Sequence, residues 1–349
     1  MKMKRILAVA LALAMGLSMI SCSQSTEREE TQPQQTEQVE QPAKTPEEKP
    51  AEKPTEKTKV NLAALSGPTA LGMLELLEQN EKGKAANDYQ VTLATAPDEV
   101  VAKVVSGELD IAAVPTNVAA TLYNKTQGGV QLAALNTMGV LYIVEAGESI
   151  QSVADLKGKT IYSTGQGSTP EYALNLVLEK NGLTVGEDVT VVYKTDNSEI
   201  APLLASLLPQ PFVTSVMGQN ETLRVALDMT EEWDKATDGA SGLTMGCVVV
   251  RTEFAQQNKE ALDLFLDEYE HSVQTVTSAE GLEHAAQLAE QYNIVKAPVA
   301  RKAIPACNIV SVQGEQMQQI AGGFLEVLYQ ANPKSVGGKL PDANFYYNR

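Results

Sequence analysis

The chain has 349 residues and carries 44 acidic side chains against 27 basic ones, which gives a formal net charge of −17. An acidic balance of this size argues against nucleic acid and anionic lipid as binding partners. The length is sufficient for a large hydrophobic core and for more than one lobe.

Residues 1–22 are predicted to be a lipoprotein signal peptide. Three basic residues precede an apolar run over residues 6–20, which is short for a membrane span but typical of a secretory signal. The run leads into Met19-Ile20-Ser21-Cys22, which resembles a lipobox, so cleavage before Cys22 would leave its thiol to carry a lipid. The alternative is a secreted protein in which Cys22 has no such role. We expect an extracytoplasmic chain that is lipid-anchored to the cell membrane.

Residues 23–59 are predicted to be a disordered tether. The segment is rich in Glu, Gln, Thr, Pro and Lys and has almost no apolar side chains, so it cannot bury enough surface to offset the entropy lost on ordering. Pro42, Pro46, Pro50 and Pro54 recur every four residues, which favours an extended spacer over a collapsed coil. The tether would hold the rest of the chain away from a membrane.

From residue 60 onward, strand-like and helix-like segments alternate. In a first unit, strand-like runs at 60–65, 89–94 and 109–114 are each followed by a turn and a helical pattern. A second unit begins with strand-like runs at 159–163 and 189–193, each again followed by a helix. Further strands are predicted at 225–229 and 243–250, and long helices over 253–292 and 314–329. This alternation predicts α/β sheets covered by helices.

The residues most often used in catalysis or metal binding are sparse. His271 and His284 lie in helical segments among Glu and Gln, which favours a solvated face over a catalytic base. For Cys247 and Cys307 the sequence favours two buried thiols, although a disulfide stays open. Trp233 is interpreted either as a stacking residue at a cleft rim or as surface packing. We therefore predict no enzyme, no cofactor and no metal site.

Three phrases of the sequence resemble one known family. They are SGELDIAAVPTNVAATLYN over residues 106–124, GCVVVRTEF over 246–254 and GGKLPDANFYY over 337–347. In this order they resemble solute-binding proteins of ABC importers, in the nitrate, sulfonate and thiamine-precursor group. The resemblance implies a small-molecule solute, an ABC permease as partner, and a monomer.

The same resemblance implies an α/β fold with two lobes, the type II periplasmic-binding-protein fold. Each lobe would be a mixed sheet flanked by helices, and hinge crossover strands near Val144 and Val248 would join the two. The expected boundaries are 60–144 plus 250–349 for lobe 1 and 145–249 for lobe 2. Closure of the lobes around the solute would then present it to the permease.

The second lobe departs from the family pattern. Where the first lobe reads VVSGELDIAAVPTNVAATL, the second reads LLASLLPQPFVTSV, which is shorter by about six residues. Either the helix from Glu199 is shortened to supply the strand, or the lobe lacks a strand near 206–209. The second case would favour an alternative function, a non-transporting ligand-sensing or scaffolding lipoprotein with the same fold.

In open α/β sheets, ligands bind at the carboxyl ends of strands, beside helix N-termini. This rule selects as ligand contacts Ser66, Gly67, Pro68, Thr69, Thr95, Pro115, Thr116, Asn117, Asn136, Thr137, Gly165, Gln166, Gly167, Ser168, Thr169 and Gln210. Each could instead be an ordinary turn or helix cap. None is basic, so a neutral or weakly basic heterocycle, such as a thiamine pyrimidine, is slightly favoured over sulfonate or nitrate.

Overall fold

The structure is a computed structural model that describes residues 56–95, 97–195, 197–200 and 205–349. The predicted signal peptide, Cys22 and the tether up to residue 55 lie outside the described residues. Residues Thr55–Arg349 form one compact unit. Within the described part of the chain, no helix has both the length and the apolar character needed to cross a membrane.

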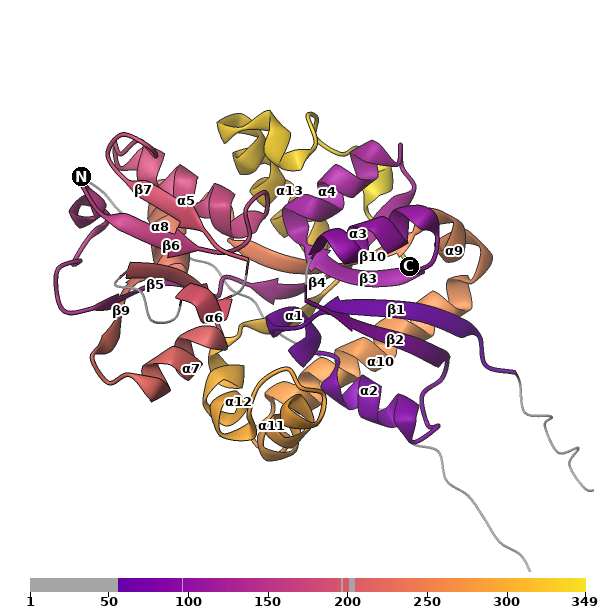
Figure 1. Cartoon of the computed structure of the whole chain (residues 1–349). Helices are drawn as coiled ribbons and strands as arrows, with labels where there is room; N and C mark the ends of the chain where they lie inside the picture. The colour runs from indigo at the N-terminus through magenta and orange to yellow at the C-terminus, as the bar shows by residue number, and fades with distance from the viewer. Residues whose placement is uncertain (1–55, 96, 196, 201–204) are drawn as a thin grey trace, which may run out of the picture. The chain divides into compact units, whose positions relative to one another are not determined.

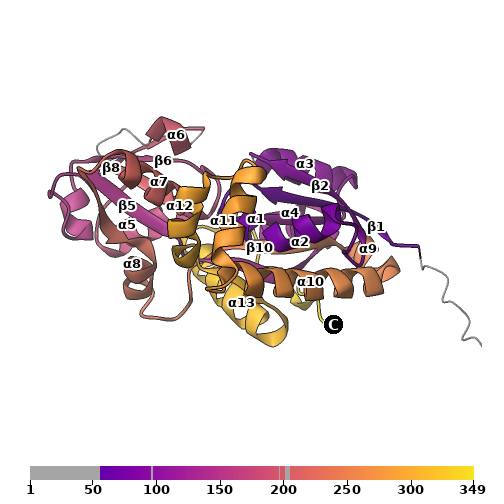
Figure 2. The ribbon, with the colours of Figure 1, turned by 90° about the horizontal axis from the view of Figure 1, so that it is seen from below.

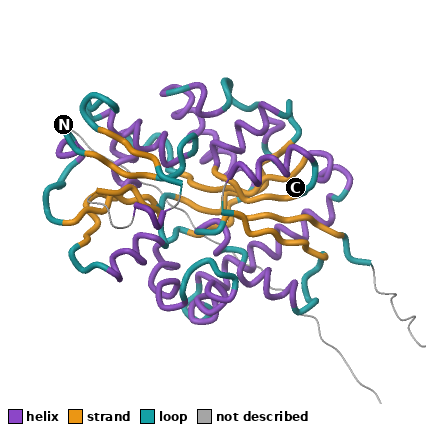
Figure 3. The backbone as a smooth tube through the Cα atoms, viewed as in Figure 1, coloured by secondary structure: helices purple, strands orange, loops and turns teal. Residues whose placement is uncertain are grey.

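The described residues form two sheets (Figures 1 and 3). The first has six strands in the order β11-β4-β10-β3-β1-β2. β1 runs parallel to β2 and β3, whereas β10 runs antiparallel to β3 and β4. The strands are β1 (Lys59–Leu65), β2 (Asp88–Ala94), β3 (Ile111–Pro115), β4 (Val130–Met138), β10 (Thr244–Arg251) and β11 (Ile309–Val312).

Alternate residues of this sheet pack into two separate hydrophobic clusters. Leu62, Ile111 and Val248 pack with α2, α10 and α11, whereas Ala112 and Val249 pack with α3, α4 and α13 on the other side. The sheet is thus buried on both faces, as its apolar strands predict. Its helices are α1 (Pro68–Leu71), α2 (Leu74–Glu81), α3 (Pro97–Ser106), α4 (Thr116–Lys125), α9 (Thr252–Gln257), α10 (Lys259–Thr277), α11 (Leu282–Gln291), α12 (Ala297–Ala303) and α13 (Gly314–Ala331).

The second sheet has five strands in the order β7-β6-β8-β5-β9. One face packs with helices α5 and α8, and the other with α6 and α7. Its elements are β5 (Leu141–Ala146), β6 (Thr160–Ser163), α5 (Thr169–Lys180), β7 (Thr190–Tyr193), α6 (Asn197–Ile200), β8 (Ala205–Pro209), α7 (Phe212–Gln219), β9 (Leu223–Asp228) and α8 (Met229–Ala236). Both sheets are therefore mixed and covered by helices, as predicted.

Two connections join the sheets, and they lie away from the predicted boundaries. The first is the short link between β4 and β5, at Gly139 and Val140, and the second leads from α8 to β10 over residues 237–243 (Figure 2). The predicted boundaries after residues 144 and 249 fall inside β5 and β10. Each strand stays apolar up to the crossover, so hydropathy did not show where the chain passes from one sheet to the other.

The strand that the sequence left in doubt is present. β8 lies between β6 and β5 in the second sheet, where Leu207 pairs with Ile143 and with Ser163. The described part of α6 ends at Ile200, whose carbonyl accepts from the Ser206 hydroxyl at 3.0 Å. The sheet therefore has no gap at 206–209.

Trp233 is fully buried, which corrects both interpretations from the sequence. Its indole Nε1 donates to the Ser241 carbonyl at 2.8 Å, and its ring lies 5.5 Å from that of Phe324. Glu231 is exposed, and residues two apart on a helix point in nearly opposite directions. The acidic residues beside Trp233 in the sequence therefore did not indicate an exposed side chain.

Cys247 and Cys307 are both free and buried, which confirms the favoured interpretation.

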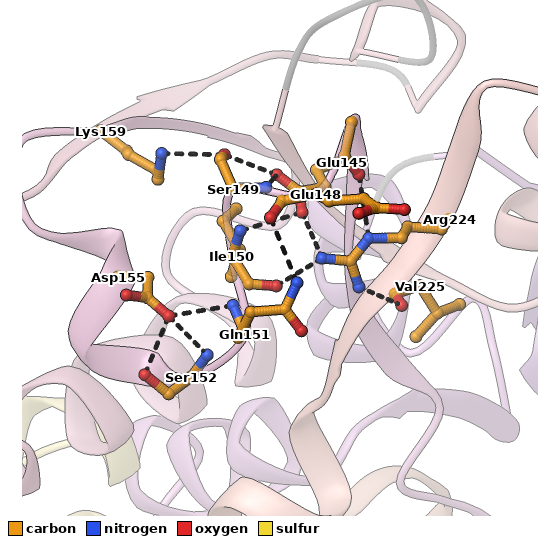
Figure 4. Close-up of polar contacts among 11 residues, drawn as sticks. Glu145, Glu148, Ser149, Ile150, Gln151, Ser152, Asp155, Lys159, Arg224 and Val225 are labelled. Atoms are coloured by element: carbon orange, nitrogen blue, oxygen red, sulfur yellow. Dashed lines mark hydrogen bonds and ion pairs between the residues drawn. The ribbon is translucent and has the colours of Figure 1, made fainter.

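An ion pair between Glu145 on β5 and Arg224 on β9 links two neighbouring strands at one edge of the second sheet (Figure 4). Glu145 on β5 is 2% exposed, and its carboxylate accepts from the Ile150 N–H, from Ser149 and from Arg224 at 2.5 Å. Arg224 also donates to the carbonyls of Gly147 and Ile150. Burial raises the pKa of Glu145, but these donors outweigh it and hold the pKa below its usual value.

Candidate ligand-binding site

Several predicted residues meet at one edge of the first sheet. The carboxyl ends of β1, β3 and β4 lie there beside the amino end of β10, because β10 is antiparallel to β3 and β4. Gly246 on β10 pairs with Pro115 on β3 and with Thr137 on β4. α4 begins directly after β3, and α1 begins shortly after β1. The edge therefore combines strand ends with helix starts, as the strand-end rule predicts.

Buried polar side chains collect at this edge. Thr116, Asn136, Thr137 and Thr244 are each 0% exposed, and Thr69 is 8% exposed. The hydroxyls of Thr116 and Thr244 lie 2.6 Å apart, and the Thr69 hydroxyl donates to the Leu65 carbonyl at 2.9 Å. Burying so many polar groups is costly unless each has a hydrogen-bond partner.

Gly246 lies at the centre of the cluster and has no room for a side chain. A Cβ atom there would clash with the Asn136 amide oxygen and would lie 2.7 Å from the Thr69 methyl. The absence of a side chain lets Thr69, Asn136 and Thr137 approach one strand backbone together. We call Thr69, Thr116, Asn136, Thr137, Thr244 and Gly246 the junction cluster.

Asn136 has an unused donor. The Thr137 hydroxyl donates to its Oδ1 at 3.0 Å, which leaves Nδ2 as the free end of the amide. Nδ2 is buried and makes no hydrogen bond. A buried donor without a partner costs about 1–3 kcal/mol. The group is suited to a bound molecule that supplies a hydrogen-bond acceptor.

Asn117 links the first sheet's helix α4 to the start of α5 beside the second sheet. Its Oδ1 accepts from the Thr169 hydroxyl at 3.3 Å, and its Nδ2 donates to the Gly167 carbonyl at 3.3 Å. Nδ2 also donates to the Ser335 carbonyl at 3.1 Å. Two of the predicted segments, 115–117 and 165–169, are thus in direct contact.

The loop before α5 is held in shape by its own hydrogen bonds. Gly165 and Gly167 have φ values of 73° and 76°, which favour glycine. The Ser168 hydroxyl donates to the Gly165 carbonyl at 2.7 Å, and the Gly167 N–H donates to Glu171 at 2.5 Å. Ser168 and Thr169 are buried, whereas Gln166 is exposed. The loop is therefore a preformed helix start.

Other predicted residues have ordinary structural roles here. Thr95 is exposed, and the Ser66 N–H donates to the Ala94 carbonyl at 2.7 Å. Pro68 occupies the first turn of α1 after Gly67. The Gln210 Oε1 accepts from the hydroxyl and N–H of Thr214, as in a helix start. These residues form turns or helix starts, and their contact with a ligand stays a prediction.

Thr244 and Gly246 were missed from the sequence. The strand-end rule considers only carboxyl ends, but β10 reaches the same edge with its amino end because it is antiparallel. The polar Thr244 directly before an apolar run was the available signal.

The junction cluster contains no charged side chain. Within the described residues, the buried charged groups are Asp110 and Glu145. Asp110 pairs with Arg251 at 2.8 Å and Glu145 with Arg224, so each is compensated elsewhere. Burial raises the pKa of the neighbouring Cys247 thiol, which keeps it neutral. The cluster offers hydroxyls, an amide and backbone groups.

Comparison with known proteins agrees with this arrangement. A family profile described as "ABC transporter, phosphonate, periplasmic substrate-binding protein" matches residues 84–206. The crystal structure of an ABC transporter from Parabacteroides distasonis is 26% identical, with a TM-score of 0.69 over 84% of this chain and 100% of that chain. The chain is thus similar to substrate-binding proteins of ABC transporters.

More distant structures share the fold of this chain. The alkanesulfonate-binding protein SsuA from Xanthomonas axonopodis pv. citri, bound to MOPS, is 15% identical, with a TM-score of 0.64 over 82% of this chain and 96% of its own. The periplasmic nitrate-binding protein NrtA from Synechocystis is also 15% identical, with a TM-score of 0.53 over 70% of this chain and 69% of its own. The search of curated proteins gave no match.

These findings confirm the type II periplasmic-binding fold. The family that the profile describes is one of periplasmic substrate-binding proteins of ABC transporters, whose role is to bind a solute.

Proposed function

We propose that this chain is a substrate-binding protein that is lipid-anchored through Cys22 and captures a small polar organic solute at the junction cluster. It acts as a monomer, and its two lobes close around the solute before delivery to the permease. The tether over residues 23–59 gives the lobes reach from the membrane.

The observation that carries the proposed site is the buried amide of Asn136. Its Nδ2 has no partner, whereas its Oδ1 is fixed by Thr137. A solute with a carbonyl, ring nitrogen or similar acceptor would relieve the cost of this donor. Because the surrounding groups are hydroxyls and amides, a neutral or weakly basic heterocycle fits best.

An oxyanion is the competing solute class. The matching family profile names phosphonate, and two of the related structures are of an alkanesulfonate-binding and a nitrate-binding protein. α4 and α5 both begin at polar residues of the predicted set, and helix N-termini can hold an anion without a basic side chain. An oxyanion would therefore use backbone N–H groups together with Asn136.

Thermal unfolding of residues 55–349 with candidate solutes tests the proposal. The panel contains pyrimidine heterocycles, alkanesulfonates, phosphonates and nitrate. A solute at a hundred times its dissociation constant should stabilise the protein by about 2.7 kcal/mol. Stabilisation by one compound class would support the proposal and identify the solute. Indifference to every class would favour the non-transporting alternative, which loses its original motivation because β8 is present.

A further inference from the structure

A second group of polar side chains lies away from the junction cluster, on the outer face of α2 and α11. These helices contact one another beside the first sheet (Figures 1 and 2). Glu75 and Glu78 are three positions apart on α2 and so share a face, and His284 lies on α11. The Glu78 Oε2 and His284 Nε2 atoms are 3.0 Å apart.

The three side chains bring potential metal ligands together. One donor atom from each of Glu75, Glu78 and His284 lies within 4.8 Å of the others. In a tetrahedral zinc site, bonds of about 2.0–2.2 Å place the donors about 3.4 Å apart. Rotation of the two glutamate side chains would bring the donor atoms closer by the remaining distance, up to about 1.4 Å.

Hydrophobic packing fixes the two helices that carry these donors. Leu74 and Leu77 of α2 and Leu288 of α11 are at most 4% exposed and belong to one hydrophobic cluster. The Cα positions of the donors are therefore fixed by packing, and only the side-chain ends need to move.

The local charge also favours a cation. Glu81 follows Glu78 on the same face and accepts from Gln291 at 3.4 Å, while Lys82 pairs with Glu78 at 2.8 Å. Nearby, the Tyr292 hydroxyl oxygen is buried and has no hydrogen-bond partner.

We propose that Glu75, Glu78 and His284 form a binding site for a divalent transition-metal ion, with Zn²⁺ as the best match. Two carboxylate oxygens and one imidazole nitrogen suit Zn²⁺, whereas Ca²⁺ and Mg²⁺ prefer oxygen ligands alone. Lys82 competes for Glu78, so the affinity is moderate. The bound ion would tie α2 to α11 and stabilise the fold.

The sequence gave no sign of this site, and it predicted that there was none. Glu78 and His284 are 206 positions apart, and only the packing of α2 against α11 makes them neighbours.

Calorimetric titration of tag-free residues 55–349 with Zn²⁺ tests the site. Glu75→Gln and His284→Ala remove one ligand each, and His271→Ala is the matched control because His271 is the chain's other histidine and lies exposed on α10. Thermal unfolding without metal verifies that each variant is folded. Parallel titrations use Mg²⁺ and Ca²⁺.

The site predicts one Zn²⁺ per chain with a dissociation constant in the micromolar range. Glu75→Gln and His284→Ala should each weaken binding at least about tenfold, and His271→Ala should leave it unchanged. The proposal is overturned if no stoichiometric binding is seen, if binding survives His284→Ala, or if His271→Ala weakens it as much. Equal binding of Ca²⁺ would also contradict the assigned ligand chemistry.

Discussion

Replacing Asn136 with alanine should separate solute binding from folding stability. In the solute-free protein, Nδ2 makes no hydrogen bond, so its removal relieves a cost of about 1–3 kcal/mol. The lost hydrogen bond from Thr137 costs about 1 kcal/mol in the opposite direction. The two terms nearly cancel, and the free energy of unfolding should change by less than about 2 kcal/mol.

Solute affinity should respond differently to the same change. Loss of a hydrogen bond to a neutral acceptor costs about 0.5–1.5 kcal/mol, or up to about tenfold in affinity. Loss of one to an anion costs about 1.5–3 kcal/mol, or roughly 10–150-fold. The size of the loss therefore also reports the charge of the solute.

Asn87 provides the matched control. It is 2% exposed, and its Nδ2 donates to the Tyr89 hydroxyl at 3.0 Å and to the Ala261 carbonyl at 2.9 Å. Asn87→Ala should destabilise the fold by about 2–3 kcal/mol and leave affinity unchanged. Denaturant unfolding and calorimetry with the stabilising solute measure both quantities. Unchanged affinity in Asn136→Ala would refute the reasoning.

Three further changes test other parts of the account. Gly246→Ala should destabilise the fold by about 1–3 kcal/mol in denaturant unfolding because its Cβ meets the Thr69 methyl, whereas Gly218→Ala, which meets nothing within 4 Å, should be neutral or slightly stabilising. The pKa of Glu145 is lowered in the folded state, so its stabilisation is present above the unfolded pKa of about 4.3 and is lost as pH falls through the lower folded value. Glu145→Gln should accordingly be less stable than wild type at pH 7, with the difference shrinking below about pH 4; a gap that stays constant with pH would contradict this. Cys22→Ser should move the full-length chain from the membrane to the soluble extracytoplasmic fraction, and continued membrane association would argue against the lipid anchor.

Local patterns were sufficient to predict the elements of the first sheet. The runs that became β1, β2 and β3 are bounded by turn residues, and each is followed by a helix start. The signal is strongest for β1 and β3, which are apolar because they are largely buried, whereas the edge strand β2 is partly exposed. The proposed ligand contacts Thr116 and Asn136 followed from the same rule, since the ends of strands that run in one direction share an edge.

Features that depend on distant partners could not be predicted this way. The sequence left open whether a strand forms near 206–209, and only the pairing of β8 with β5 and β6 shows that it does. The role of Gly246 depends on which strands flank β10. Trp233 is buried because α8 packs it against Phe324, almost a hundred positions along the chain.

The most direct test of the central claim is a crystal structure of residues 55–349 with the solute that stabilises them. The account predicts that an acceptor atom of the solute lies about 2.7–3.2 Å from Asn136 Nδ2, among the hydroxyls of the junction cluster. A solute bound elsewhere, with Nδ2 still unpartnered, would contradict the proposed site.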